Sequence, residues 1–345
     1  MDERNKNKRV TIYDIAKEAG VSAATVSRAI SGKGYVSEKT KKKILNLVDK
    51  YNFKPNIFAK NLQSGFSKTI GFIVPHIGHM YFASVYYEFE KWASRNGYMT
   101  ILLNAKNDRQ LETKLLQSLR EKHVDGIVIM GGRIDEVNLE KKYIKEIKNL
   151  NKLIPCILCS EKASRFECSG IHVNDKIGIR LLLEHLSSKG YKNIYMIGGN
   201  SSTLPSYLKK KYAVEIAREL NMDINTEKTV HSSFDYESGY RDMLSLLEDG
   251  KYPDAVLCIN DYVAIGALKA LKEKGVRVPQ DMAVTGYDNV GESWLITPQI
   301  TTIDPNYPVY GKKVFECLQH LIENPKEQRH ETLLINPELI VREST

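Results

Sequence analysis

Residues 21–32 read VSAATVSRAISG, and this stretch indicates a helix shaped to approach another molecule closely. Ser22 stands directly before the run and is a residue type that caps helices. Val26 and Ile30 then repeat at helical spacing and can form a buried face. Ala23 and Ala24 lie where an exposed helix normally carries charge. The outward side chains of this stretch are small, which raises the question of which surface they contact.

The flanking sequence predicts two further helices. Thr11 is followed three residues later by Asp14, as in a capping box, and Gly20 is a natural helix stop. Ser37 can cap a third helix. The apolar residues of that helix are expected to face inward: Ile44, Leu45, Val48 and Tyr51. Three short helices, the first two joined by a tight turn, describe a helix-turn-helix bundle.

Positive charge is concentrated in the first fifth of the 345-residue chain. Residues 1–68 contain 15 Lys and Arg against 6 Asp and Glu, whereas residues 69–345 contain 35 against 36. This asymmetry is typical of a polyanion-binding module joined to a neutral body. A basic segment without such a partner is the alternative, and composition alone does not separate the two. The length suggests two or more domains.

The sequence gives no sign of export or membrane insertion. The charged start has no apolar run behind it, and no stretch of about 18 apolar residues occurs. The odd number of cysteines, five, indicates reduced thiols in a cytoplasm. Cys156 and Cys159 form a CxxC pair on an expected strand, where residues three apart face opposite sides. We therefore expect core thiols and no metal site.

From residue 69 onward, apolar runs alternate with helical stretches. The expected strands are 69–74, 98–103, 126–130, 154–158, 193–198, 255–259 and 282–287. The expected helices are 81–95, 109–122, 136–150, 175–189, 205–221, 236–249 and 261–274. Continuous apolar strands separated by helices argue for parallel sheets covered on both faces. The number of units favours two doubly wound subdomains with a ligand cleft between them.

The helix that begins after Ser22 has the side chains of a DNA-recognition helix. In a helix-turn-helix protein, the second helix enters the major groove with its N-terminal residues at the base edges. Ser22, Thr25 and Ser27 can donate to phosphates, and Arg28 is long enough to reach a guanine edge. The alanine methyl groups can contact thymine. An ordinary amphipathic surface helix is the alternative on spacing alone.

Longer segments of the sequence resemble those of the lactose-repressor (LacI) family of bacterial transcription regulators. In the first part these are VTIYDIAKEAGVS, TVSRAISG, YVSEKTKKKI and PNIFAKNL. In the body they include TIGFIVP, VDGIVIM, INDYVAIGAL, GVRVPQDMAVTGYD and VREST. The resemblance covers nearly the whole chain. It implies a helix-turn-helix DNA-binding headpiece at 1–55, a hinge helix and linker at 56–68, and an effector-binding and dimerisation body at 69–345.

The implied fold is an all-α headpiece plus an α/β body. The body resembles periplasmic sugar-binding proteins, in which two doubly wound parallel-sheet subdomains enclose a small ligand. We expect the N-subdomain at about 69–168 and 300–328, and the C-subdomain at about 169–299 and 329–345.

The resemblance further implies that the chain binds a palindromic double-stranded DNA operator as a homodimer. The family's hinge segment inserts a leucine into the minor groove, and by position that leucine is Leu62. A small packing contact is the alternative for Leu62. The residues expected to contact DNA are Thr11, Ser22, Ala23, Ala24, Thr25, Ser27, Arg28, Asn56, Ala59, Lys60 and Leu62.

Effector-binding positions carry over from the same resemblance. Tyr81 and Phe82 match an aromatic pair at the first helix of the cleft, and Phe234 matches a ring that stacks on the ligand. Asp261 matches an acid at a helix start that binds ligand hydroxyl or NH groups. Core packing for the aromatics and helix capping for Asp261 are the alternatives. The expected set is Tyr81, Phe82, Asn174, Ser206, Phe234, Asp261 and Asp288.

Two departures from the family pattern bear on the effector. Ser206 takes a position at which many members have an Arg, and a frequent VDN is VND here, at Val173, Asn174 and Asp175. Losing the Arg weakens the expectation of a purine, a carboxylate or a typical sugar. A regulator whose main input is a protein partner is therefore the alternative reading.

We interpret the chain as a cytoplasmic transcription regulator and a repressor of carbohydrate-related genes. The effector is expected to be a sugar or sugar derivative, with no cofactor, metal or membrane partner. A periplasmic-type binding protein fits less well because of the basic headpiece, and no catalytic pair supports an enzyme. The segment 198–200, GGN, lacks the spacing of a phosphate loop.

Overall fold

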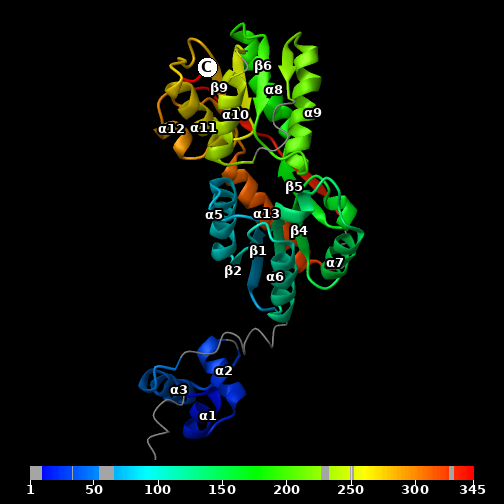
Figure 1. Cartoon of the computed structure of the whole chain (residues 1–345). Helices are drawn as coiled ribbons and strands as arrows, with labels where there is room; N and C mark the ends of the chain where they lie inside the picture. Colours follow the sequence, from blue (N-terminus) through cyan, green and yellow to red (C-terminus); the bar gives the residue numbers. More distant parts are fainter. Residues whose placement is uncertain are drawn as a thin grey trace, which may run out of the picture. The chain divides into compact units, whose positions relative to one another are not determined.

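The computed structural model describes residues 10–32, 34–53, 66–226, 233–248, 250, 252–325 and 330–345. They form two compact units, divided after Ser67 (Figure 1). Each unit has its own hydrophobic core.

The first unit consists of three short helices, as the sequence predicts. They are α1 (Ile12–Ala19), α2 (Ala23–Ser31) and α3 (Glu38–Lys50). Thr11 and Asp14 form the predicted capping box, and Gly20 ends α1 in the left-handed region with φ of 72°. Ser22 and Ser37 each accept a hydrogen bond from a backbone N–H of the helix that they cap. Local capping chemistry thus sets the limits of all three helices.

The core of this unit is centred on three fully buried side chains, one from each helix: Ile15, Val26 and Ile44. Two expectations for α3 are wrong. Leu45 and Tyr51 are 39% and 36% exposed, and the Tyr51 hydroxyl donates to a Glu18 carboxylate oxygen at 2.7 Å. Helix α3 places only a narrow stripe against the core, formed by Ile44, Leu47 and Val48, so residues beside this stripe remain at the surface.

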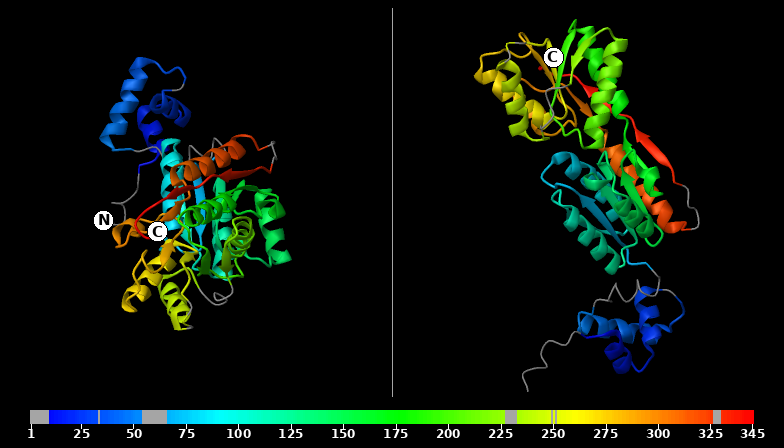
Figure 2. Two further views of the ribbon diagram at one scale, coloured as in Figure 1. Left: turned by 90° about the horizontal axis from the view of Figure 1, so that it is seen from above. Right: turned by 45° about the vertical axis from the view of Figure 1, so that its right-hand side comes forward.

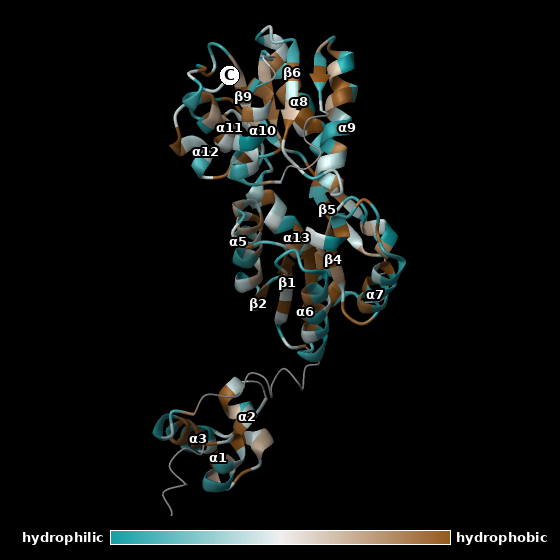
Figure 3. Ribbon diagram, in the orientation of Figure 1, coloured by the Kyte–Doolittle hydropathy of each residue, from teal (hydrophilic) through white to brown (hydrophobic). Residues whose placement is uncertain are grey.

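The first sheet of the body has six parallel strands in the order β11-β5-β4-β3-β1-β2. The strands are β1 (Thr69–Val74), β2 (Met99–Asn104), β3 (Gly126–Met130), β4 (Cys156–Cys159), β5 (Ser169–Val173) and β11 (Thr332–Ile335). Their apolar character is plain in Figure 3, where most of the strands are brown.

Helices cover both faces of this sheet, as continuous apolar strands require. On one face lie α5 (Met80–Arg95) and α13 (Tyr307–Glu323); on the other lie α6 (Arg109–Glu121), α7 (Lys141–Asn151) and η3 (Ala163–Phe166). Cys156 packs in the core on the second face and Cys159 in the core on the first. The predicted core thiols on opposite faces are confirmed.

The second sheet has four parallel strands in the order β7-β6-β8-β9. They are β6 (Asn193–Ile197), β7 (Asp223–Asn225), β8 (Ala255–Cys258) and β9 (Ala283–Thr285). The helices are α8 (Asp175–Ser188), α9 (Leu204–Glu219), α10 (Tyr236–Glu248), α11 (Asp261–Glu273) and the short α12 (Glu292–Leu295). Helix α8 packs on α9, and α10 on α11.

Helices α10 and α11 meet at two glycines. A Cβ on Gly239 would lie 2.1 Å from a Val263 carbonyl oxygen, and one on Gly266 would lie 2.0 Å from a Tyr236 carbonyl oxygen. The close approach of the two backbones therefore requires glycine at both positions.

Over the described residues of the body, the chain passes between the two sheets three times, and the crossings lie later than expected. Strand β5 and, near the C-terminus, β11 both belong to the first sheet, where they pair with each other (Figure 2). The antiparallel pair β10 (Thr302–Asp304) and β12 (Glu338–Ile340) packs on the second core instead. The boundaries proposed near residues 168, 299 and 328 therefore fall before the crossings. Strand pairing across about 160 residues leaves no local signal in the sequence.

The helix expected at 136–150 is shorter than predicted. A 3-10 turn, η2 (Gly132–Asp135), is followed by extended chain, and α7 begins only at Lys141. The intervening backbone pairs with the second subdomain, since Glu136 forms an antiparallel bridge with Thr203. This tertiary pairing overrides the helical pattern of the segment.

Candidate functional site

The outward face of α2 combines small side chains with one long cation. Ala24, Ser27, Arg28 and Ser31 are exposed, at the spacing of one helix face. Val26 and Ala29 on the opposite side are buried in the core. The sequence-predicted recognition helix is therefore built as expected, with its polar face free of the fold's own packing.

The Arg28 guanidinium has no hydrogen-bond or ion-pair partner among the residues that the structure describes. Its aliphatic part lies against Gly34, where an added Cβ would be 3.0 Å from Arg28 Cδ. Gly34 has a φ of 96°, which disfavours any larger residue. The chain after α2 thus leaves room for the stem of Arg28, and its five donors remain available.

The other predicted DNA-binding side chains are partly occupied by caps. Ser22 Oγ accepts from the Thr25 N–H at 3.1 Å and lies 2.9 Å from Thr25 Oγ1. Thr11 Oγ1 donates to an Asp14 carboxylate oxygen at 2.7 Å. Ala23 is half-buried, so Ala24 is the more accessible alanine. Four further expected contacts lie outside the described residues: Asn56, Ala59, Lys60 and Leu62.

The body contains a second group of chemically active residues, at the junction of its two subdomains. His79, at the start of α5, meets the start of α11 from the other subdomain. Asn260 Nδ2 donates to His79 Nε2 at 3.0 Å, and the Tyr262 hydroxyl accepts from the Met80 N–H at 3.2 Å. Burial lowers the pKa of His79 to about 4, so its ring is neutral at pH 7.

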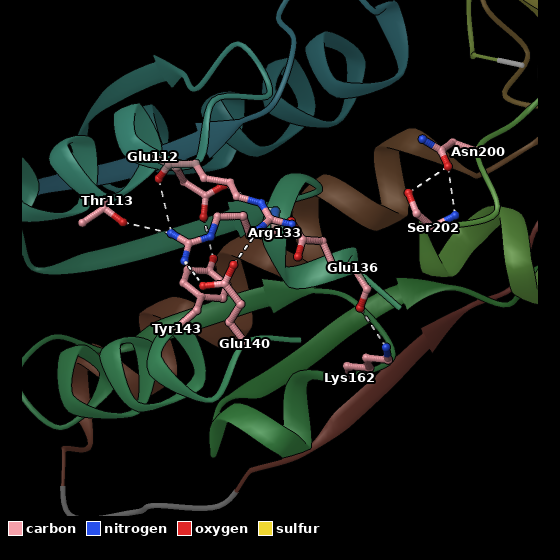
Figure 4. Close-up of polar contacts among 10 residues, drawn as sticks. Glu112, Thr113, Arg133, Glu136, Glu140, Tyr143, Lys162, Asn200 and Ser202 are labelled. Carbon is pink, nitrogen blue, oxygen red and sulfur yellow. Dashed lines mark hydrogen bonds and ion pairs between the residues drawn. The ribbon is translucent and has the colours of Figure 1, made fainter. Parts of the chain in front are cut away.

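A second contact joins the subdomains, and Figure 4 shows Lys162 on one side of it and Asn200 and Ser202 on the other. The Val137 N–H donates to the Ser202 carbonyl at 2.8 Å. Lys162 Nζ donates to the carbonyls of Glu136 and Val137 at 2.9 and 2.8 Å, which fixes this strand-like segment. Asn200 Oδ1 accepts from the N–H and the hydroxyl of Ser202 and so shapes the partner loop.

A buried network positions the η2 turn just before this contact. Arg133 is 9% exposed, stacks on the Tyr143 ring at 3.7 Å and donates to Thr113 Oγ1 at 2.9 Å. Glu112 is 3% exposed and accepts from the Tyr143 hydroxyl at 2.6 Å. Figure 4 shows these side chains converging behind the loop that carries Glu136. The η2 turn is therefore anchored before it reaches the other subdomain.

Among the predicted effector residues, Asp288 is the one whose side-chain carboxylate has no internal hydrogen bond in the described part of the chain. It is 7% exposed and has a φ of 97°, which strains a residue other than glycine. Among the described residues, no hydrogen-bond donor reaches its carboxylate. Burial, opposed by Lys209 and reinforced by Asp175, raises the pKa of Asp288 to about 6. A buried, strained carboxylate without a partner is typical of a binding site.

Lys209, on α9, is a residue that the sequence analysis missed. It is 7% exposed, and its Nζ lies 3.3 Å from the centroid of the Tyr287 ring. The nearest carboxylate oxygen is that of Asp175, at 3.9 Å, and this same oxygen accepts from the Tyr287 hydroxyl at 2.7 Å. The run KKK at 209–211 looks like a solvated helix face, so only the position of Lys209 one turn after Ser206 could have identified it.

The predicted aromatic residues contact one another and neighbouring segments of the junction. Tyr81 and Phe82 contact each other edge to face at 5.4 Å between centroids, and Tyr307 lies 6.2 Å from Tyr81. The Tyr307 hydroxyl donates to the Asp288 carbonyl, and the Phe234 carbonyl accepts from Asn260 Nδ2 at 3.0 Å. The predicted aromatic residues therefore lie beside segments that form hydrogen bonds with Asp288 or with Asn260, the partner of His79.

Three predicted effector residues are committed to the fold. Asp261 is fully buried, and its two carboxylate oxygens accept from Thr302 Oγ1 at 2.6 Å and from the Val290 N–H at 2.8 Å. Ser206 is also fully buried and accepts from Thr203 Oγ1 at 3.0 Å. Asn174 caps α8 by accepting from a backbone N–H. The capping alternative for Asp261 is wrong, because Asn260 is the N-cap of α11 and accepts from the Val263 N–H, whereas both Asp261 oxygens accept from donors outside this helix.

Known proteins share this architecture and its sequence patterns. A model described as "Bacterial regulatory proteins, lacI family" matches residues 11–56, and one described as "Periplasmic binding protein-like domain" matches residues 183–345. The HTH-type transcriptional repressor PurR of Mannheimia succiniciproducens is 32% identical over 336 residues, covering 97% of this chain and 98% of that protein. The chain belongs to the LacI family.

Other members of the family are similar over the same length. The ribose operon repressor of Haemophilus influenzae is 30% identical over 334 residues, covering 97% of this chain and 98% of that protein. The crystal structure of the Lac repressor dimer bound to operator and the anti-inducer ONPF superposes with a TM-score of 0.86. It is 24% identical and covers 98% of this chain and 99% of that one. At this identity the likeness concerns the fold.

Within the described ranges, none of the helices combines the length and apolar character that a membrane span requires. In the same part of the chain, no three His, Cys, Asp or Glu side chains are grouped so that they could hold a metal ion.

Proposed function

We propose that the protein is a sequence-specific transcription repressor that binds a palindromic DNA operator as a homodimer. The observation that carries the proposal is the outward face of α2, where Ala24 and Ser27 permit close approach and the Arg28 guanidinium has no described protein partner. Arg bidentate to guanine is the commonest specific base contact in the major groove. Family membership and the basic first unit support the same reading.

The effector site of the repressor is the junction between the two subdomains of the body. Asp288 supplies an unpartnered carboxylate, and the ring pair of Tyr81 and Phe82 supplies apolar contact. A ligand that bridges the subdomains differs in affinity between their open and closed arrangements, and this difference is what shifts operator binding. Lys209 provides the buried cation that Ser206 lacks, so a small ligand is favoured over a protein partner as the main input. The regulated genes are proposed to be carbohydrate-related.

The proposed role is regulatory rather than enzymatic. A transcription repressor acts on chromosomal DNA, which places the proposed site of action in the cytoplasm.

Selection from random DNA tests the proposal. The full-length protein is incubated with a pool of random duplexes, and bound sequences are enriched at a salt concentration that suppresses non-specific binding. The expected result is enrichment of one palindromic sequence, with two half-sites symmetric about its centre. Retention of the whole pool without enrichment of any sequence would refute a sequence-specific repressor.

A further inference from the structure

Arg28 is surrounded on its own helix by residues that cannot hold its side chain. The positions three and four residues away, which are the neighbours that a helical side chain contacts, are Ala24, Thr25, Ser31 and Gly32. None of them carries a carboxylate or a long apolar group. A free arginine side chain samples many rotamers, and binding fixes one of them at an entropic cost. A contact that restricts the Arg28 stem before DNA binds therefore favours recognition.

The turn after α2 supplies such a contact at Gly34. An added Cβ at this position would lie 3.0 Å from Arg28 Cδ and 3.5 Å from Arg28 Cγ, so two methylene groups of the stem lie beside the Gly34 backbone. Carbon atoms pack best at about 3.5–4.0 Å, so a Cβ at this position would push the stem away from the turn. Glycine thus allows a contact between turn and stem that any larger residue displaces.

The elements on either side fix the position of Gly34. Gly32 ends α2 with a φ of 68°, and its N–H donates to the Arg28 carbonyl at 3.0 Å. Beyond the turn, Val36 packs on the core of the first unit and Ser37 caps α3. Gly34 itself has a φ of 96°, a conformation that glycine adopts without strain. The turn is therefore attached at both ends, and the fold itself holds Gly34 against Arg28.

We propose that Gly34 is a positioning residue for sequence recognition, and that its backbone holds the Arg28 stem in the rotamer from which the guanidinium reads a guanine. The inference rests on the proposed function, in which Arg28 contacts a base edge. Gly34 acts through Arg28 and requires no contact of its own with DNA.

Displacing the stem is expected to affect specificity more than general affinity for DNA. Two parallel hydrogen bonds to one guanine require the guanidinium in one plane and at one distance from the base edge. A displaced guanidinium keeps its charge, so its attraction to phosphates is unchanged. Loss of discrimination between base pairs, with little change on random DNA, is therefore the signature of the positioning role.

Fluorescence anisotropy of the full-length protein measures this discrimination. The probes are the palindromic duplex obtained by the DNA selection, the same duplex with one base pair changed symmetrically in both half-sites, and a random duplex. Each base pair of the half-site is changed in turn. The pair at which Arg28→Ala no longer distinguishes the change is the pair that Arg28 reads. Discrimination at that pair is the dissociation constant of the changed duplex divided by that of the palindrome.

Gly34→Ala adds the Cβ that meets the Arg28 stem. A bidentate contact contributes roughly 5- to 150-fold to discrimination, and a displaced guanidinium loses part of it, so we expect a fall of about 3- to 10-fold. Gly32→Ala is the matched control, because Gly32 also has a positive φ but an added Cβ there would meet nothing within 4 Å. It reproduces the backbone strain without the contact and should keep wild-type discrimination.

A second substitution keeps the test decisive if strain in Gly34→Ala unfolds the helical unit. Gly34→Asn carries the same Cβ, and asparagine tolerates a positive φ better than alanine does. We expect Gly34→Asn to show the same loss of discrimination as Gly34→Ala.

A double-mutant cycle separates positioning from a purely structural effect. Arg28→Ala removes Cγ and Cδ, so Gly34→Ala displaces nothing in that background. We expect Gly34→Ala to weaken binding of the palindrome about 3- to 10-fold in the wild-type background and less than about twofold in the Arg28→Ala background.

Wild-type discrimination in both Gly34→Ala and Gly34→Asn would overturn the inference, and so would equal weakening by Gly34→Ala in the two backgrounds. If a palindrome is enriched and Arg28→Ala loses discrimination while the Gly34 variants keep it, only this inference fails and the repressor remains. If no sequence is enriched in the selection, the proposed function itself fails.

Discussion

Asp288→Asn is expected to change how the stability of the body depends on pH. The Asp288 carboxyl is 7% exposed, and its pKa is raised from the ordinary 3.8 to about 6, chiefly by burial. Because the raised pKa belongs to the folded state, the folded protein holds this proton more tightly than the unfolded chain does. The residue therefore destabilises the fold increasingly as pH rises from about 4 to about 6, and by a constant amount above that range.

The size of the effect follows from the shift. Roughly two pKa units at 1.36 kcal/mol each amount to about 3 kcal/mol between pH 4 and pH 7. Asparagine keeps the shape and has no charge, so this contribution is absent in Asp288→Asn. The free energy of unfolding of the variant minus that of the wild type should be about 3 kcal/mol more positive at pH 7 than at pH 4. The cation of Lys209 lowers the pKa and Asp175 raises it, and the shift of about two units already includes both.

Urea unfolding followed by tryptophan fluorescence measures this difference. The chain has two tryptophans, Trp92 and Trp294, and both belong to the body, so the signal is not affected by the helical unit. Titrations at half-unit steps from pH 4 to pH 7.5 give the free energy of unfolding of each protein. A difference between variant and wild type that stays constant over this range would refute the account of Asp288 as a buried, unpartnered carboxylate.

Three further predictions follow from contacts in the body. Asp261→Ala leaves Thr302 Oγ1 and the Val290 N–H without an acceptor in the core, so the free energy of unfolding should fall by about 2–5 kcal/mol. Urea titration measures this change, and a fall below about 1 kcal/mol would contradict the structural role given to Asp261. Lys162→Met removes two hydrogen bonds to the Glu136–Val137 segment and should lower the free energy of unfolding by about 1–2 kcal/mol, whereas the exposed Lys142→Met should not; equal effects in thermal unfolding would argue against the contact. Affinity for a neutral sugar should fall as pH drops below about 6, because the protonated Asp288 carboxyl loses its value as an acceptor, and calorimetric titration at pH 5 and pH 7 measures this.

The helical unit could be predicted from sequence because its determinants are local. Thr11, Ser22 and Ser37 cap the three helices as expected, and Gly20 ends the first. Arg28 could likewise be placed on the outward face from spacing alone. The error at Leu45 arose because a helical period does not reveal how wide a stripe its neighbours cover.

The strands of the body could be predicted where they are continuous apolar runs, but the sheet to which each strand belongs could not be predicted. Strand β11 pairs with β5, which is distant in sequence, and nothing near Thr332 signals this. The segment at 136–140 has a helical pattern and is extended, since its backbone pairs with the other subdomain. Tertiary pairing decided both cases.

The effector site shows the same limit at the level of single residues. Asp261 has the sequence context of a ligand-binding acid, yet burial and two internal donors commit it to the core. Lys209 has the context of a solvated lysine, yet it is buried beside Tyr287 and Asp175. Which of the two is free to bind depends on packing between distant segments, which residue type and spacing do not encode.

The affinity of Arg28→Ala for DNA decides whether α2 reads the operator sequence. Fluorescence anisotropy is measured on the selected palindrome, on the same duplex changed at one base pair in each half-site, and on a random duplex. Loss of a bidentate contact to guanine costs about 1–3 kcal/mol, so the variant should bind the palindrome roughly 5- to 150-fold more weakly and no longer distinguish the changed base pair, with little change on random DNA. If Arg28→Ala binds all three duplexes more weakly by the same factor, Arg28 contacts phosphate and does not read a base pair.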